Sequence, residues 1–166
     1  MSTRIELGNL SIIWQASQDR ITLHLIGDVD ETFQHDRIPL EQKLPIYLNL
    51  SQVKHFNSIG IREWIHFMRR LSKICQPVLQ ECSVSFVDQI NMVPDSLGNG
   101  NVESFYAPYY CACGQECNRL IQVSQSEEDL KNFEAPLFSC DCGKNLEFDA
   151  IEESYFQFLQ HLPKVG

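Results

Sequence analysis

Two copies of one short cysteine motif lie in the last third of this 166-residue chain. They read Cys111-Ala-Cys113-Gly114 and Cys140-Asp-Cys142-Gly143. Two such pairs can bring four thiolates to one tetrahedral zinc ion, and a glycine after each pair suits a turn with positive φ. The spacing therefore predicts a structural Zn²⁺ site held by Cys111, Cys113, Cys140 and Cys142.

The remaining cysteines leave alternatives to this ligand set. Cys117 follows the first motif and can replace Cys111 or Cys113 as a ligand. Disulfide or redox chemistry is the other interpretation, but the chain holds seven cysteines, so full internal pairing would leave one over. Cys75 and Cys82 lie in apolar periodic segments, which is typical of core residues.

Composition indicates a globular protein of the cytoplasm. Apolar residues make up 43% of the chain, which is enough for a hydrophobic core. The first residues contain no apolar signal core, and no stretch is apolar enough to span a membrane. The net charge is −9, and residues 109–149 hold eight acidic and three basic side chains. This balance opposes contact with a phosphate backbone, so we expect a protein partner and not a nucleic acid.

Hydrophobic periodicity predicts an α/β domain before the cysteine motifs. Alternating residues favour strands, and spacings of three and four residues favour amphipathic helices. We expect strands over residues 3–7, 10–15, 21–25, 46–50, 77–82 and 101–108, and helices over 61–75, 83–94 and 151–162. Asn57 or Ser58 is placed to cap the first of these helices. The order predicts a mixed β-sheet with helices packed on it.

Three units follow from these elements. We expect one domain over residues 1–108, a zinc ribbon over 109–149 and a C-terminal helix over 150–166 that packs back on the fold. The polar run from Ser124 to Asp129 is interpreted as a loop of the ribbon. The ribbon has few large apolar side chains, so metal binding would contribute folding free energy of order 10 kcal/mol.

Three segments read Ile26-Gly27-Asp28-Val29-Asp30, Ile46-Tyr-Leu-Asn-Leu-Ser51 and Phe56-Asn57-Ser58-Ile59-Gly60-Ile61. Through these segments, residues 5–108 resemble the STAS domain, the fold of bacterial anti-sigma factor antagonists. The first segment resembles the motif at a strand end of that family, the second resembles its central strand, and the third resembles the turn that opens the next helix. Two aspartates of the family pattern are replaced here, by Asn49 and Asn57.

The resemblance implies a signalling role that is switched at Ser58. In the family, an anti-sigma kinase can phosphorylate the serine or threonine of this turn, and the dephosphorylated protein binds the kinase. Ser58 occupies that position, and Asp28, Asp30, Asn57 and Ser58 would contact the partner. A helix N-terminus favours a phosphate, although Ser58 can equally be a plain N-cap.

Three functions are compared on this basis. The leading hypothesis is a non-catalytic signalling or scaffold protein whose STAS-like module binds a protein partner, either an anti-sigma-type kinase or another signalling protein. The alternative is a zinc ribbon that recognises a protein of the transcription machinery or RNA. A third is a thiol oxidoreductase that uses Cys111 or Cys113, but a zinc ion with four thiolate ligands has no open position for catalysis.

Overall fold

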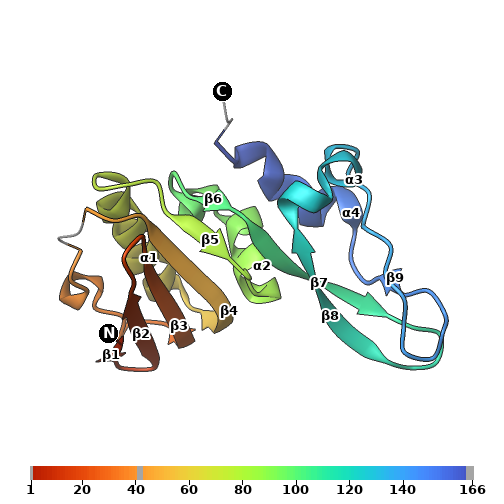
Figure 1. The fold of residues 1–166 in the computed structure, drawn as a ribbon. Helices are drawn as coiled ribbons and strands as arrows, with labels where there is room; N and C mark the ends of the chain where they lie inside the picture. The colour runs from red at the N-terminus through yellow and green to blue at the C-terminus, as the bar shows by residue number, and fades with distance from the viewer. Residues whose placement is uncertain (1, 41–42, 164–166) are drawn as a thin grey trace.

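A computed structural model of the chain describes residues 2–40 and 43–163, which form two β-sheets with helices packed against them (Figure 1). The first sheet consists of β1 (Ser2–Leu7), β2 (Leu10–Ala16), β3 (Ile21–Val29), β4 (Ile46–Phe56), β5 (Val78–Gln80) and β6 (Asn101–Val102), in this order. Strands β1, β2 and β3 are antiparallel, whereas β3 to β6 are parallel. The predicted mixed sheet of an α/β fold is therefore confirmed.

Burial alternates along β3 as its sequence predicts. Ile21, Leu23 and Leu25 are buried, and Thr22 and His24 between them are only half-buried. Successive side chains of a strand point to opposite faces, so one face of the sheet carries the core. This face receives the helices.

Helices α1 (Ser58–Ser72) and α2 (Val84–Met92) pack together over the sheet. Trp64 of α1 lies against Phe86 of α2, with 5.5 Å between the ring centroids. The indole Nε1–H of Trp64 donates to the carbonyl of Ser96, 2.9 Å away, in the 3-10 helix η2 (Pro94–Leu97). A fully buried large apolar side chain contributes about 1.5–3 kcal/mol, so these contacts hold both helices on the sheet.

The N-terminus of α1 lies against the end of β3. Asn57 is the cap, because its Oδ1 accepts the N–H of Gly60 at 2.8 Å, and Ser58 becomes the first helical residue. A Cβ atom on Gly60 would lie 1.9 Å from the carbonyl oxygen of Val29. Glycine is therefore required here for the close approach of helix and strand.

The second sheet consists of β8 (Glu116–Gln122), β7 (Ser104–Tyr110) and β9 (Glu147–Phe148), all antiparallel. A parallel bridge between Cys82 and Phe105 links β7 of this sheet to the residues that follow β5. The C-terminal segment, α4 (Glu152–Tyr155) and η4 (Phe156–His161), packs on α2. Phe105 lies 5.1 Å from Phe158 between ring centroids, so both sheets share one continuous core.

Three sequence predictions differ from the structure. The strand predicted over residues 101–108 is divided between β6 of the first sheet and β7 of the second sheet. The run from Ser124 to Asp129 is not a loop, because it forms η3 (Val123–Gln125) and the start of α3 (Glu127–Lys131), whose Leu130 is buried. The C-terminal helix is α-helical only over α4 and tightens to a 3-10 helix afterwards. Phe156, Leu159 and Leu162 recur every three residues, which is the 3-10 period, and all three contact or belong to the core.

Among residues 2–40 and 43–163, no helix combines the length and the apolar character needed to cross a bilayer.

Candidate metal centre

Each cysteine motif forms the tip of a β-hairpin. Tyr110 pairs with Glu116 at the first tip, and Ser139 pairs with Asn145 at the second. Residues 111–115 and 140–144 therefore occupy equivalent positions. The N–H of each first cysteine donates across its tip at 2.8 Å, to the carbonyl of Gln115 or of Lys144.

Glycine closes each tip in the left-handed region. Gly114 has φ of 96° and Gly143 has φ of 90°. Their N–H groups donate to the carbonyls of Cys111 and Cys140, at 2.9 and 3.0 Å. A Cβ atom at either glycine would meet no atom within 4 Å, so conformation and not space requires glycine here.

The two tips face one another and bring four sulfur atoms together. The Sγ atoms of Cys111, Cys113, Cys140 and Cys142 all lie within 4.8 Å of one another. Cys111 Sγ lies 3.5 Å from Cys142 Sγ, and Cys113 Sγ lies 3.8 Å from Cys140 Sγ. A tetrahedral ion with bonds of about 2.3 Å to sulfur requires edges of about 3.8 Å, whereas a disulfide requires about 2.05 Å. These four cysteines can hold one metal ion.

The backbone around the sulfurs favours thiolates, while their mutual proximity opposes them. The pKa of Cys142 is lowered to about 7. The main cause is a hydrogen bond from the backbone N–H of Lys144, and the second is a hydrogen bond from the Cys111 thiol. The backbone N–H of Cys113 also lowers the pKa of Cys111, but desolvation and the adjacent thiols outweigh it and raise that pKa to about 12. Four negative sulfurs at this distance need a cation, so binding of a metal ion displaces thiol protons.

One polar side chain beside the sulfurs was missed by sequence reasoning. Gln115 Oε1 accepts a hydrogen bond from Cys140 Sγ at 3.2 Å, so it joins the first tip to a sulfur of the second. The sequence could have indicated this residue by its position, because Gln115 directly follows the first cysteine motif and therefore lies close to its sulfur atoms. Side chains that orient metal ligands in this way belong to the design of a metal site.

Packed aromatic rings hold the two hairpins in position below the tips. Tyr109 lies edge-on to Phe138 and Phe148, with ring centroids 5.1 and 5.6 Å apart. Its hydroxyl donates to the carbonyl of Pro136 at 2.8 Å. Burial raises the pKa of Tyr109, so the hydroxyl stays a donor. The hairpins are therefore fixed by apolar contacts as well as by any bound metal.

The fifth cysteine of this region lies outside the sulfur cluster. Cys117 is on β8 opposite Tyr109, half-buried, and the group that can hold a metal ion does not include it. Burial raises the pKa of Cys82, the fully buried thiol that follows β5. All seven cysteines lie in the described residues, and none of them is bonded to another.

A second set of predicted residues gathers at the N-terminus of α1. The Nδ2 amide of Asn57 donates to Glu31 at 2.5 Å, and Ser58 beside it is exposed. Asp30 accepts hydrogen bonds from Asn9 Nδ2 at 2.6 Å and from the backbone of Thr32, and these bonds lower its pKa. Carboxylates and the exposed Ser58 hydroxyl therefore lie at the same edge of the sheet.

Asp28 lies near this edge but is placed differently. Its side chain is half-buried, and within the described part of the chain nothing donates a hydrogen bond to its buried Oδ1. Its backbone N–H donates to the carbonyl of Asn9 at 3.0 Å, so the end of β3 is tied to the β1–β2 turn. Glu31 makes the direct contact with Asn57.

Comparison with known proteins adds no further assignment. No protein-family model, curated protein or solved structure matches this chain. What stands is a mixed α/β fold with four cysteines that can bind a metal ion.

Proposed function

We propose that this chain is a non-catalytic signalling or scaffold protein whose STAS-like module, residues 1–108, binds a protein partner. The observation that carries the proposal is the exposed Ser58 at the first turn of α1, beside Asp30 and Glu31. A hydroxyl in this position is accessible to a kinase. The carboxylates beside it make the local charge sensitive to phosphorylation.

The three segments that resemble the STAS family occupy suitable elements. Residues 26–30 lie at the end of β3, residues 46–51 lie in β4, and residues 56–61 lead from β4 into α1. β4 lies between β3 and β5, in the interior of the first sheet. The placement supports the resemblance without depending on sequence similarity elsewhere.

Phosphorylation would change the partner surface in two ways. A phosphate on Ser58 adds a charge of about −1.5 to −2 next to Asp30 and Glu31, which repels an acidic partner. The same phosphate faces the N-terminal end of α1, whose dipole and free N–H groups stabilise it. The modified state would thus carry more negative charge on the surface where the partner is proposed to dock.

We further propose that the four cysteines bind zinc as a structural ion. Four thiolates in tetrahedral positions suit Zn²⁺, and complete sulfur ligation leaves no site for water or substrate. The tips have little packing of their own, since both tip glycines face open space. Zinc would hold the tips and leave the chemistry of the protein to its contacts with partners.

The test is affinity capture from the native cell with four forms of the full chain. Wild type and Ser58→Ala should capture the same protein, and Ser58→Asp should lose it. Ser72→Asp is the matched control, because it adds the same charge to an exposed serine at the other end of α1. Equal capture by all four forms would remove the switch, and capture of nothing by wild type would remove the partner-binding module.

A second candidate function is recognition through the zinc ribbon itself. Cys113 and Cys142 are exposed at the open tips, where a partner can approach them. The acidity of residues 109–149 favours a basic protein surface of the transcription machinery over RNA. An electrophoretic mobility shift with RNA that weakens steeply with salt would reverse this preference.

A further inference from the structure

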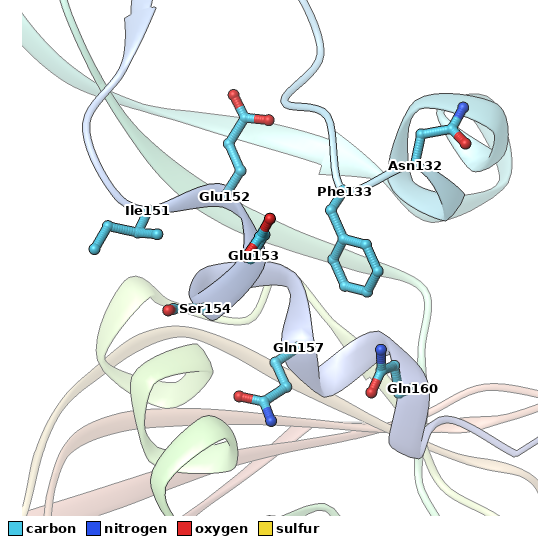
Figure 2. A pocket seen from close by; sticks show the side chains of 8 residues that line it. All are labelled: Asn132, Phe133, Ile151, Glu152, Glu153, Ser154, Gln157 and Gln160. Atoms are coloured by element: carbon cyan, nitrogen blue, oxygen red, sulfur yellow. The ribbon is translucent and has the colours of Figure 1, made fainter.

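An open groove lies in the C-terminal lobe, away from the sulfur cluster and from α1. It is formed by α3 and the turn after it on one side and by α4 and η4 on the other. Two adjoining hollows of about 860 and 430 Å³ make up the groove, and Phe133 and Gln160 line both. Figure 2 shows Phe133 projecting from the turn toward the helical segment that carries Gln157 and Gln160. We call this feature the Phe133 groove.

Phe133 occupies a backbone position that is unfavourable for it. Its φ is 55°, in the left-handed region where glycine or asparagine usually ends a helix. The turn is fixed by the N–H of Phe133 donating to Leu130 and the N–H of Glu134 donating to Asp129. A residue with a Cβ atom costs about 1–2 kcal/mol in this region. Phe133 is half-buried between the two hollows. Backbone strain of this kind is often found at binding sites, so the surroundings of the Phe133 ring are a candidate site.

The smaller hollow of the Phe133 groove is mostly apolar. Leu130 and Phe133 line it from α3 and its turn, and Leu159 and Leu162 line it from the C-terminal segment. Leu130 is buried, whereas the other three are half-buried and retain accessible surface. Their apolar surface suits insertion of an aliphatic or aromatic side chain.

Acidic side chains surround this apolar floor. Glu152 and Glu153 line the larger hollow, and Glu127 lines the smaller one together with the basic Lys131. Three acidic side chains and one basic side chain therefore line the two hollows, a net charge of −2.

We propose that the Phe133 groove is a docking site for a basic amphipathic segment of a partner protein. An apolar side chain of the segment packs against Phe133, Leu130 and Leu159. Lysine or arginine side chains that flank this anchor pair with Glu127, Glu152 and Glu153. Charge complementarity selects this partner, because an acidic segment would be repelled by the net negative charge of the residues that line the groove.

The probe is a fluorescein-labelled peptide of three Lys-Leu-Leu-Lys repeats, measured by fluorescence anisotropy against the full zinc-loaded chain. Its counterpart carries glutamate in place of every lysine. Phe133→Asn removes the anchor and suits the left-handed backbone, so this variant keeps its fold. Glu152→Gln with Glu153→Gln removes two charges of the groove, and Asp36→Asn with Glu116→Gln removes two exposed charges elsewhere.

We expect the basic peptide to bind and its acidic counterpart not to bind. Phe133→Asn and the double variant at Glu152 and Glu153 should each weaken binding about tenfold or more, as loss of an anchor does. The control pair and Ser58→Asp should stay within twofold of wild type, which separates this site from the proposed switch. Absence of binding, or equal loss in the groove and control variants, would overturn the proposal.

Discussion

Removal of the proposed zinc ion should loosen the two hairpin tips and leave the rest of the fold in place. The tips comprise residues 111–115 and 140–144, and each tip carries two of the four clustered cysteines. Directly below them, Tyr109 packs against Phe138 and Phe148. Apolar packing is independent of metal, so we expect the boundary of loosening to fall between the cysteines and these rings.

The free energy that the ion must supply follows from the residues and hydrogen bonds of the tips. Ordering their ten residues costs about 1–2 kcal/mol each, or about 10–20 kcal/mol together. Four backbone hydrogen bonds across the tips contribute about 0.5–1.5 kcal/mol each. A structural zinc ion contributes about 10–16 kcal/mol, which is the size of the remainder. Without the ion, the tips have no comparable source of order.

Hydrogen exchange measured by mass spectrometry is the assay, with and without a chelator. The amides of Cys111, Gly114, Cys140 and Gly143 should exchange at least about a hundredfold faster in the metal-free chain, which corresponds to about 2.7 kcal/mol of local stability. Peptides that contain β3 and β4 should exchange as before.

Two cysteine variants provide the matched comparison. Cys142→Ser removes an exposed member of the cluster, and Cys117→Ser removes the neighbouring cysteine outside it. We expect one zinc ion per chain in wild type and in Cys117→Ser, and loss of zinc from Cys142→Ser. Unchanged exchange at the tips after chelation, or loss of zinc from Cys117→Ser, would refute the reasoning.

The remaining predictions concern the first helix and the thiols. Asn57→Ala should lower the free energy of unfolding by about 1 kcal/mol through loss of the cap, and Ser58→Ala by less than about 0.5 kcal/mol, as urea titration would measure. Gly60→Ala should cost at least about 1–3 kcal/mol by the same titration, because its Cβ would overlap the carbonyl oxygen of Val29. Acidification from pH 7.5 to 5 should release the metal into a colorimetric chelator. In the metal-free chain the Cys111 thiol, with its pKa raised to about 12, stays protonated throughout this range, and Cys142, with its pKa lowered to about 7, becomes protonated within it, so protons compete with the ion more strongly as pH falls. A metal content independent of pH, an unchanged Gly60→Ala variant or equal effects at Asn57 and Ser58 would each contradict its own prediction.

Features that depend on local chemistry could be read from the chain. The glycine after each cysteine pair predicted a turn with positive φ, and Gly114 and Gly143 adopt it. Alternation of apolar residues predicted β3, and the spacing of Trp64 and Leu71 predicted α1, because strand and helix periods impose their pattern on neighbouring residues. These signals arise within a few residues, so no knowledge of the fold was needed.

Other features were decided by contacts between distant segments. Sequence spacing allowed Cys117 as a ligand, but β8 pairs it with Tyr109 and the sulfur cluster forms without it. The sequence allowed either Asn57 or Ser58 as the cap of α1. In the structure the backbone N–H of Asn57 donates to Val29 at the end of β3, and Asn57 is the cap.

The amino-acid sequence alone therefore determined which residues can bind a metal ion, which can form a tight turn and which segments alternate between apolar and polar residues. These properties belong to side chains and their nearest neighbours in the sequence. Tertiary structure decided which of them meet. Phe133 and Leu159 face one groove only because α3 and η4 fold onto the same core, and packing between remote elements leaves no periodic trace in the sequence.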